Sequence, residues 1–537
     1  MSDRFYLPVE VAGITFKNPF YVASGPTART VKQLVAIEKA GWAAASLKLA
    51  VDPPPYISRY PRYAIFPQYN ALGFTAEKRL TFDEGRRVIE DAKKQLTELI
   101  LMANITYSGE LGADGWVNMA LGFEASGADI IELNMCCPNM SFNVQTTAGD
   151  KAASTQSTGA SMGQDENAVA DVVRAIKKKL GVPLVVKLTP EGGNIGNVAR
   201  AAYLAGADAV SGTASRLGMP PINLENPEKS IIHLQGEPGI ACMGGAWIKP
   251  LALRDTFEIR KICGPDVPIL ATGGVRTAED ALETAMCGGD LIGICTETLI
   301  RGYDFIGDVI ENTRRWLEAH GYSGLREIRD RMIPAIKSAP ELTLYRGNAK
   351  VVTPGVIAPC MAACPKSVEI QAVLRRTSEE NIERAIQLAS GSEHCADCHA
   401  PCETACVRGR VDKAVSVKNI LLNLRDSAKE MGADVTASSG SKSSGRPVAK
   451  ASDVIRRRQI EGIGTLSSDT QSEAARCLRC GCGEGCGVCA DLCCEFAISY
   501  DNDNRVTIAP EHCVACGMCY NRCPDNNIEM YNTGEKL

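Results

Sequence analysis

The feature that most constrains this chain is the uneven distribution of its cysteines. Of 23 cysteines in 537 residues, six precede residue 350 and the other seventeen lie between Cys360 and Cys523. In a long chain, cysteines at such close spacing indicate metal binding rather than disulfide bonding. The length exceeds what one hydrophobic core can organise, and about three domains are expected. The sequence therefore predicts a cysteine-poor front region and a cysteine-rich back region with different chemistry.

Charge and hydropathy argue against several classes of protein. The first residues, MSDRFYLPVEVAG, lack a basic segment followed by an apolar run, so we expect no secretory signal. No apolar run approaches the roughly 18 residues that a membrane-spanning helix needs. The formal net charge of -5 gives no sign of a nucleic-acid or anionic-membrane partner. We therefore expect a cytoplasmic protein.

The front region, to about residue 345, alternates short apolar or β-branched runs with amphipathic segments. The runs include 44–49, 99–105, 128–134, 184–188, 207–212, 268–274 and 290–295. Repeated βα units indicate a parallel sheet, and this length suits a closed (β/α)₈ TIM barrel with insertions. An open doubly wound sheet is the alternative. It is disfavoured because no Gly-x-Gly-x-x-Gly follows the first run.

Polar and cationic residues recur where the predicted strands end. In TIM barrels these carboxyl ends carry the chemistry. Reading only those positions gives Ser24, Gly25, Lys48, Asn104, Asn134, Lys187, Thr213, Gly273, Gly274 and Thr296. Taken singly, each is compatible with an ordinary loop residue. Together they predict a pocket that holds a polyanionic ligand.

One strand-end loop makes the pattern more specific. The segment Asn134-Met-Cys-Cys-Pro-Asn resembles the Asn-x-Ser-Cys-Pro loop of class 1 dihydroorotate dehydrogenases and dihydropyrimidine dehydrogenases. Further matching segments are Gly163-Gln-Asp, Lys187-Leu-Thr-Pro, Gly244-Gly-Ala-Trp-Ile-Lys-Pro-Leu-Ala-Leu-Arg and Ile269-Leu-Ala-Thr-Gly-Gly. The similarity extends from Val9 to about Ile310. The front region is thus identified as similar to the FMN-binding barrel of this family.

The resemblance implies bound FMN and assigns roles to named residues. Lys48 would lie near the flavin, and Lys187 would stabilise the negative charge of reduced flavin. Asn104 and Asn134 would donate hydrogen bonds to the isoalloxazine ring or the substrate. The residues expected to hold the cofactor are Ser24, Gly25, Lys48, Asn104, Asn134, Lys187, Thr213, Gly245, Gly273, Gly274, Thr296 and Glu297. Among them, residues 245, 273, 274, 296 and 297 would form the phosphate site, where backbone N–H groups favour an anion.

The family's catalytic cysteine corresponds to Cys137, with Lys187 and Asn134 completing the catalytic set. A thiol, with an ordinary pKa of about 8.5, is mostly protonated at neutral pH yet can give up its proton. In reduction, Cys137 would protonate the carbon alpha to a carbonyl while the flavin delivers hydride to the beta carbon. A buried, inert cysteine is the alternative reading. The neighbouring Cys136 replaces the family's usual serine and is interpreted as structural.

Departures from the family pattern bear on the substrate. Thr213-Ala-Ser stands where the dihydropyrimidine enzymes have Thr-Asn-Thr, so the amide that grips a pyrimidine is missing. Losing such a hydrogen-bonding group discriminates strongly between substrates. A long insertion, about residues 141–161, also follows the catalytic loop. We therefore expect a substrate other than uracil or thymine, contacted by Asn70 and Ser215.

The back region contains the strongest motif of the chain, Cys513-x₂-Cys516-x₂-Cys519-x₃-Cys523-Pro. This is the bacterial ferredoxin run, whose fourth cysteine ligates the other cluster of a pair. The partner motif is Cys482-x₃-Cys486-x₂-Cys489-x₃-Cys493, in which either Cys482 or Cys480 is the first ligand. By the exchange rule, Cys523 completes one [4Fe-4S] cluster and Cys493 the other. Zinc is the alternative, but its sites need only paired Cys-x₂-Cys units.

A third cysteine group comprises Cys360, Cys364, Cys395, Cys398, Cys402 and Cys406. Its spacing resembles the helical iron–sulfur domain of glutamate synthase small subunits. The family's Cys-x₂-Cys upstream of Cys360 is absent, which leaves one of that domain's two clusters open. The best ligand candidates are Cys364, Cys398 and Cys402, with Cys395 or Cys406 as the fourth. At least one [4Fe-4S] cluster is expected here.

The predicted domains are a barrel over 1–345, a helical iron–sulfur domain over 346–432, a linker over 433–470 and a ferredoxin-like α+β domain over 471–537. No Rossmann fingerprint is present, so electrons must pass to or from a separate NAD(P)H-oxidising flavoprotein or a ferredoxin. A homodimer or hetero-oligomer is expected by resemblance. The sequence favours a reductase of activated C=C bonds. A true dihydropyrimidine or dihydroorotate dehydrogenase and a non-catalytic relay subunit are the alternatives.

Overall fold

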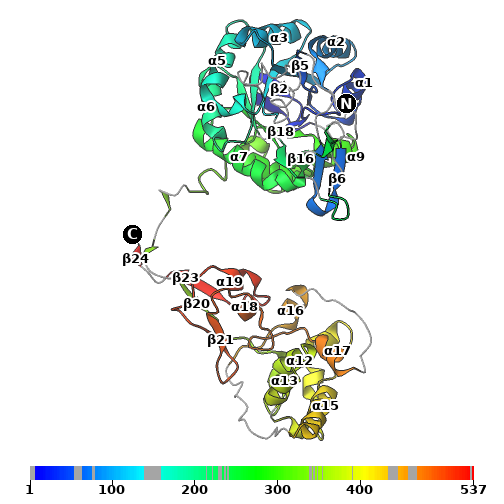
Figure 1. The fold of residues 1–537 in the computed structure, drawn as a ribbon, viewed down its shortest axis with the longest axis vertical. Helices are drawn as coiled ribbons and strands as arrows, with labels where there is room; N and C mark the ends of the chain where they lie inside the picture. The colour runs from blue at the N-terminus through cyan, green and yellow to red at the C-terminus, as the bar shows by residue number, and fades with distance from the viewer. Residues whose placement is uncertain are drawn as a thin grey trace. The chain divides into compact units, whose positions relative to one another are not determined.

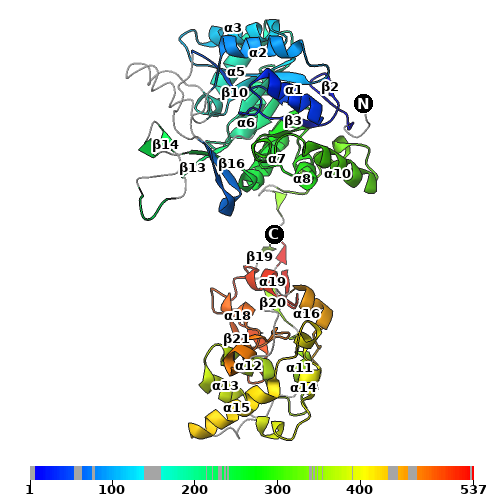
Figure 2. The ribbon, with the colours of Figure 1, turned by 90° about the vertical axis from the view of Figure 1, so that its right-hand side faces the viewer.

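The chain forms two compact units, residues Met1–Pro340 and Glu341–Leu537, in a computed structural model (Figures 1 and 2). The structure describes residues 6–53, 63–74, 79–137, 159–212, 215–219, 222–227, 233–234, 237–238, 241–337, 341–342, 345–346, 349–353, 355–389, 391–432, 446–457, 469–532 and 535–536. Most of the predicted insertion, Thr213, and much of the predicted linker lie outside these residues. In the part of the chain so described, no helix is long and apolar enough to cross a membrane.

The first unit is a closed barrel of eight parallel strands, which confirms the predicted (β/α)₈ fold. The strands are β3 (Phe20–Val22), β4 (Ala44–Ser46), β9 (Ile100–Tyr107), β10 (Ile130–Met135), β11 (Leu184–Leu188), β12 (Ala209–Gly212), β17 (Ile269–Thr272) and β18 (Leu291–Ile294). They pair in the order β3-β4-β9-β10-β11-β12-β17-β18, and β18 pairs with β3 to close the barrel. The open doubly wound sheet is therefore wrong.

Helices surround the strands, as Figure 1 shows. They are α1 (Val31–Ala40), α2 (Phe82–Lys93), α3 (Ala113–Ala125), α5 (Glu166–Lys177), α6 (Ile195–Leu204), α7 (Lys249–Cys263), α8 (Ala278–Met286), α9 (Thr296–Arg301) and α10 (Ile306–Ala319). Their starts are encoded locally: Thr30, Thr81 and Thr277 each form a capping box with the residue three positions on. One apolar face of each longer helix is buried against the strands, as Val169, Val173 and others of α5 illustrate.

Two apolar layers stabilise the barrel. The larger lies between strands and helices and includes Phe20, Leu101, Ile131 and Val186. The smaller includes Tyr21, Met102, Val185 and Leu270, each directly adjacent in sequence to a residue of the larger layer. Because side chains of a strand alternate between its two faces, this second set fills the barrel interior. Side chains from the hairpin of β1 (Val9–Val11) and β2 (Ile14–Phe16) join the second layer.

An antiparallel sheet accompanies the barrel. It consists of β6 (Tyr63–Phe66), β7 (Ala71–Phe74), β13 (Arg216–Gly218) and β16 (Ala241–Gly245) in the order β13-β16-β7-β6. Strands β5 (Ala50–Asp52) and β8 (Leu80–Thr81) extend the barrel sheet beside β9, and β14 (His233–Leu234) pairs with β15 (Glu237–Pro238). Strands β13, β14 and β16 gather on one side of this unit (Figure 2). The sheet brings β7 and the glycines that end β16 to the site.

The second unit contains a helical part and a smaller mixed part. The helices are α11 (Pro359–Ala363), α12 (Ile370–Ser378), α13 (Ile382–Leu388), α14 (Pro401–Thr404), α15 (Val417–Glu430), α16 (Ala451–Arg457) and α17 (Thr470–Ala475). They enclose a core that includes Val373, Leu374, Leu421 and Leu424. The mixed part has α18 (Val488–Asp491), α19 (Met518–Arg522), and the hairpin of β21 (Ile498–Tyr500) and β22 (Val506–Ile508).

Two further strand pairs join the beginning of the second unit to its end. Strand β20 (Ala349–Val352) pairs with β23 (Glu529–Asn532), and β19 (Tyr345–Arg346) pairs with β24 (Glu535–Lys536). In Figure 1, α12, α13 and α15 gather at one end of this unit and the strands with α18 and α19 at the other. The division of this unit into two separate domains stays a prediction.

Candidate functional site

A cavity of about 1140 Å³, counted with its open mouth, lies where the barrel strands end. The predicted site residues that line it are Ser24, Gly25, Lys48, Asn134, Cys137, Lys187, Ser215, Gly245, Gly273, Gly274, Thr296 and Glu297. The barrel brings them together because its parallel strands all end at the same edge.

Two predicted residues are placed away from the cavity wall, and a third lies outside the described residues. Asn70 is exposed at the end of a short 3₁₀ helix and does not line the cavity. Asn104 is fully buried and lies one layer below the cavity, in contact with Asn134. Thr213 lies outside the described residues. The substrate contact predicted for Asn70 stays a prediction.

The charge of the described cavity wall is predominantly positive. Lys48, Arg79, Lys187 and Arg276 line it, against one carboxylate, Glu297. Burial raises the pKa of Glu297, although Arg301 and other cations oppose this shift. A wall of this kind attracts an anion with several charges, as the strand-end residues predict.

Glycines form a cradle at one end of the cavity. Gly245, Gly273 and Gly274 have φ angles of 105°, 132° and 77°, in the region that side chains disfavour. A Cβ on Gly274 would come within 2.8 Å of the backbone nitrogen of Lys249, and one on Gly245 within 2.7 Å of the Asn70 carbonyl oxygen. The backbone is thus bare where the chain approaches the cavity, which suits N–H contact with a phosphate.

A buried polar network supports the floor of the cavity. The register pairs Glu132 with Asn104 and Asn134 with Lys187 on neighbouring strands. Asn104 donates its amide to Glu132 and accepts a hydrogen bond of 2.9 Å from the Asn134 amide. Ser46 also donates to Glu132. The network fixes the direction of the Asn134 side chain before any ligand binds.

Lys187 is only 6% exposed. Burial alone would lower its pKa, but the charge of Glu132 and the nearby thiols outweigh that effect, and the pKa of Lys187 is raised. The lysine therefore keeps its positive charge at neutral pH. A fixed cation in a dry cavity is well placed to stabilise negative charge that develops on a bound group.

Cys137 lines the cavity directly after β10. The Asn134 side-chain oxygen accepts the backbone N–H of Cys137 at 3.1 Å, which sets the turn that carries the thiol. Arg79 donates from Nη2 to the Cys137 sulfur at 3.4 Å and is 3% exposed. Its Nη1 has no hydrogen-bond partner within the described parts of the chain. Burial raises the pKa of the neighbouring Cys136 to about 12, so Cys136 stays a thiol.

The sequence reasoning missed Arg79 and Glu132. Arg79 follows no strand-end pattern and has no motif of its own. Glu132 stands within an apolar strand, where a lone carboxylate is expensive to bury without partners. A single carboxylate within an apolar strand was therefore the sequence signal that a polar network surrounds Glu132.

The second unit contains two cavities lined by the predicted ferredoxin cysteines. One is lined by Cys482, Cys486, Cys489 and Cys523, and the other by Cys493, Cys513, Cys516 and Cys519 together with Cys494. Each group contains the cysteine that the exchange rule assigns to it. N–H groups approach the sulfurs: Ala497 donates to Cys493 at 3.3 Å, and Asn527 donates to Cys523 at 3.2 Å and to Cys482 at 2.7 Å.

The helical part brings its cysteines into two further groups. Cys364, Cys398 and Cys402 are the electrostatic neighbours of Cys395. A separate cavity is lined by Cys360, Cys406, Cys477 and Cys480. Cys406 therefore belongs to a different group from Cys395, and Cys480 belongs to a different group from Cys482. The sequence reasoning left Cys477 unassigned, although its Cys-x₂-Cys spacing with Cys480 was a visible signal.

The choice between zinc and an iron–sulfur cluster depends on how closely the cysteines of a site are held. Four thiolates around one Zn²⁺ lie roughly 3.8 Å apart, as a Zn–S bond of about 2.3 Å requires. Across the residues that the structure describes, no set of three or more His, Cys, Asp or Glu side chains is arranged to hold a single metal ion. Four cysteines around an open cavity suit a larger group such as an iron–sulfur cage.

The barrel fold with its cationic cavity and the comparison with known families together identify a flavoprotein oxidoreductase. The family model described as dihydroorotate dehydrogenase matches residues 6–317, and the chain belongs to this family. The catalytic chemistry follows from membership: the protein is an oxidoreductase that acts on CH–CH groups.

Three relatives illustrate the range of the family. The chain is 25% identical over 336 residues to the NAD-dependent dihydropyrimidine dehydrogenase subunit PreA of Escherichia coli strain K12, covering 60% of this chain and 75% of that protein. It is 28% identical over 327 residues to the catalytic subunit of dihydroorotate dehydrogenase B (NAD(+)) of Alkaliphilus metalliredigens, covering 60% and 97%. It is 24% identical over 344 residues to the chloroplastic dihydropyrimidine dehydrogenase (NADP(+)) of Arabidopsis thaliana, covering 60% and 76%.

Proposed function

We propose that the protein is the catalytic subunit of an FMN- and iron–sulfur-dependent oxidoreductase that reduces, or forms, a C=C bond next to a carbonyl. Cys137 carries the proton, and electrons travel through [4Fe-4S] clusters to or from a separate flavoprotein or ferredoxin. The observation that carries the proposal is Cys137 beside a cationic cavity that ends in a glycine cradle. A relay without chemistry would not need a reactive thiol at that point.

The barrel cavity fits FMN. The cradle of Gly245, Gly273 and Gly274 suits the phosphate, because a side chain there would collide with neighbouring backbone or side chains. Lys48 and Lys187 suit the flavin ring, and both are more than nine-tenths buried. When bound, FMN supplies hydride transfer to or from the beta carbon. This pairing of cradle and buried cations supports the predicted roles of these residues.

The chain's own groups handle the proton and the negative charge. In reduction the Cys137 thiol gives its proton to the alpha carbon, and in oxidation the thiolate removes it. Asn134 orients the turn that carries Cys137 through the hydrogen bond to its N–H. Lys187, kept charged by Glu132, stabilises negative charge at the base of the cavity.

The cysteine groups of the second unit are the proposed cluster sites. Each of the four groups offers at least four cysteines, the number that a [4Fe-4S] cluster takes. The sequence analysis expects at least three clusters, and the structure offers four sites. The fourth arises because Cys477 and Cys480 supply the Cys-x₂-Cys pair that is absent upstream of Cys360. The relatives named as a subunit PreA and as a catalytic subunit support a separate partner that exchanges electrons with NAD.

Arg79 favours an acidic substrate. Its buried guanidinium touches the Cys137 sulfur and keeps Nη1 without a partner in the described structure. An unpaired buried cation is costly unless a ligand supplies the counter-charge. Of the substrate classes that the relatives' names give, the acid dihydroorotate satisfies Arg79, whereas neutral dihydropyrimidines do not. A dihydroorotate-like carboxylic acid is therefore the second candidate substrate, beside other unsaturated acids.

The test is an oxygen-free preparation of the full chain, with analysis of flavin, iron and sulfide, followed by reoxidation assays. Chemically reduced protein is mixed with orotate, uracil or small unsaturated acids, and reoxidation of the flavin absorbance is followed. Cys137→Ser should slow reoxidation by about two orders of magnitude or more while flavin and iron contents stay unchanged. Equal rates in both proteins would favour the relay function, and a preparation without flavin would refute the proposal.

A further inference from the structure

We infer that the helical part and the ferredoxin-like part of the second unit form one electron-transfer body, joined at Cys480-Gly481-Cys482 and locked by Glu484. The inference rests on the clusters proposed above. It concerns a feature that the family comparison does not cover, because the matched region ends at residue 317. Three observations carry it: the sharing of neighbouring cysteines between two sites, the packing of glycines against α12, and an ion-pair cluster around Glu484.

Two cysteines two positions apart belong to different sites. Cys480 lines the cavity that also contains Cys360, Cys406 and Cys477, whereas Cys482 lines the cavity of Cys486, Cys489 and Cys523. Two residues of extended chain span at most about 7 Å. The backbone N–H of Cys482 donates to the Val356 carbonyl at 2.6 Å, which fixes the segment as it passes between the sites.

The same kind of sharing links the other sites in a row. Cys360 and Cys364 lie one helical turn apart around α11, and Cys402 and Cys406 are spaced likewise around α14. Each of these pairs contributes one cysteine to each of the two helical-part groups. Cys489 and Cys493 connect the two ferredoxin-like groups in the same way. The junction at Gly481 therefore turns two separate pairs of sites into one continuous series of four.

The junction loop approaches the start of α11 and the helix α12 so closely that side chains at its glycines would collide with them. A Cβ on Gly481 would lie 2.5 Å from the Ala358 nitrogen, and one on Gly485 would lie 2.4 Å from the Gln371 Cβ. One on Gly487 would overlap the Arg375 guanidinium, at 1.4 Å. The Gln371 side-chain oxygen also accepts the Gly481 N–H at 2.9 Å. Such approach of backbone to a helix indicates a fixed contact rather than a loose linker.

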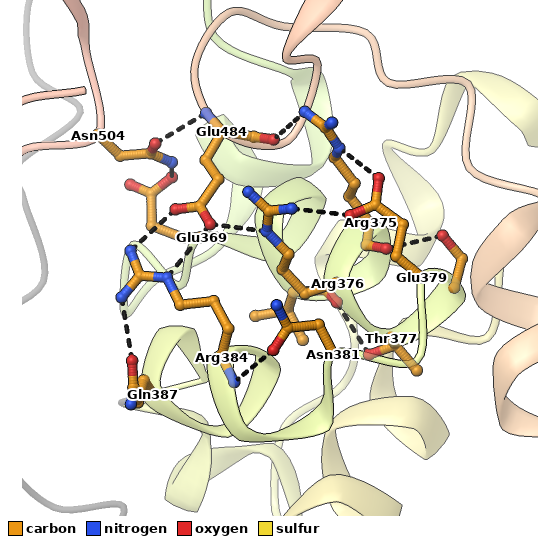
Figure 3. Close-up of polar contacts among 12 residues, drawn as sticks. Glu369, Arg375, Arg376, Thr377, Glu379, Asn381, Arg384, Gln387, Glu484 and Asn504 are labelled. Atoms are coloured by element: carbon orange, nitrogen blue, oxygen red, sulfur yellow. Dashed lines mark hydrogen bonds and ion pairs between the residues drawn. The ribbon is translucent and has the colours of Figure 1, made fainter. Parts of the chain in front are cut away.

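Glu484, between Gly483 and Gly485, is the centre of the lock (Figure 3). Its carboxylate accepts from Arg376 Nε at 2.7 Å and from Arg384 Nη2 at 2.9 Å, and its side chain is 6% exposed. Its backbone carbonyl accepts from Arg375 Nη1 at 3.1 Å, and its N–H donates to Asn504 at 2.8 Å. Charge-assisted bonds shielded from water are the strong class of hydrogen bond.

The lock explains an irregular spacing. The first interval of the upstream motif, Cys482-x₃-Cys486, is one residue longer than the two of the downstream motif. The three residues of that interval are Gly483, Glu484 and Gly485, which place the glutamate against α12 and α13 between two glycines that allow the approach. The longer interval is therefore the part of the ferredoxin-like module that binds it to the helical part.

The test uses electron paramagnetic resonance of the full chain, prepared without oxygen and reduced with dithionite. We expect about sixteen irons per chain and signals broadened by magnetic coupling between neighbouring clusters. In the double variant Cys477→Ser, Cys480→Ser the Cys482-site signal should lose the broadening caused by the Cys480 site and keep only that caused by the Cys493 site, while about twelve irons remain. An unchanged signal in that variant would overturn the inference. Absence of iron from the unaltered chain would instead refute the proposed function.

The role of Glu484 is tested by hydrogen exchange against a matched control. Glu379 pairs with Arg375 and Arg376 at 2.7 and 2.8 Å but lies outside the junction loop. Glu484→Ala should speed amide exchange across residues 481–487 at least about tenfold. It should also narrow the coupled electron paramagnetic resonance signal of the neighbouring clusters. Glu484→Gln should have smaller effects on both measurements. Glu379→Ala removes a neighbour of Arg375 and Arg376 but leaves their bonds to Glu484 in place, so it should change the exchange rate and the signal much less. Equal effects of Glu484→Ala and Glu379→Ala would show that Glu484 is no lock.

Discussion

Arg79 provides the sharpest test of the site, because its charge and its position beside Cys137 predict which of two alkylating reagents reacts faster with that thiol. Iodoacetate and iodoacetamide alkylate a thiol in the same way: the S–C bond forms, iodide leaves and the thiol proton passes to solvent. The reagents differ only in charge. With ordinary thiols the neutral reagent reacts faster. Beside Arg79, the anionic reagent should react faster at Cys137.

The magnitude follows from the distance. Arg79 Nη2 lies 3.4 Å from the Cys137 sulfur, and Nη1 has no partner in the described residues, so a reagent carboxylate can approach to roughly 4 Å. Two unit charges at that separation interact by about 4 kcal/mol at an effective dielectric constant near 20. If a mobile reagent retains about a third of this interaction energy in the transition state, the preference for iodoacetate is about 1.4 kcal/mol, or tenfold in rate.

The assay compares the two reagents on flavin-loaded, oxygen-free protein, with alkylation at Cys137 followed by peptide mass spectrometry. Arg79→Met should remove the roughly tenfold preference for iodoacetate. Arg254→Met is the control, because Arg254 is exposed and pairs with Glu258 on the surface of α7. The reasoning is refuted if the ratio of the two rates is the same in Arg79→Met and the unaltered protein.

Three further predictions follow from the barrel. Burial raises the pKa of Cys136 to about 12, so Cys136 should resist alkylation at pH 8 under conditions that modify Cys137, as the same mass spectra will show. Gly274→Ala should abolish flavin retention, because its Cβ would collide with backbone at 2.8 Å; Gly264→Ala, with a similar positive φ and nothing within 4 Å, should lose only about 1–2 kcal/mol of stability and keep the flavin. Burial opposes ionisation of Glu38, but three backbone N–H bonds outweigh it and lower its pKa. Glu38→Gln should therefore cost about 1 kcal/mol in thermal unfolding at pH 7, and this difference should vanish as the pH falls through the lowered pKa, where the unaltered carboxylate is also neutralised.

The barrel was predictable because its signals are local and repeated. Seven of the eight strands coincide with apolar runs that the sequence analysis names, and β3 completes the set. The strand-end rule then selects cavity residues without knowledge of any contact, since parallel strands share one edge. One strand-end residue, Asn104, lies below the cavity wall and contacts Asn134. Asn70, which the family resemblance and not the strand-end rule predicts, is exposed between β6 and β7.

Arg79 and Glu132 show what local pattern cannot supply. Arg79 reaches Cys137 across 58 positions of sequence, and nothing near residue 79 encodes that meeting. The role of Glu132 depends on the hydrogen bonds that it accepts from Asn104 and Ser46, and the pairing register of three strands brings these residues together. Both depend on closure of the barrel, which is a property of the whole sheet.

The sequence by itself determined the kinds of chemistry: a βα repeat that closes into a barrel, and cysteines whose short intervals are set by tight turns around a cluster. These patterns can be read locally because the groups involved are close along the chain. Only the tertiary structure decided which cysteines share a cavity and which charge stands beside the reactive thiol. Cys360, Cys406 and Cys480 come from three distant segments, and packing of α12 against the glycine-rich junction, rather than spacing, brings them together.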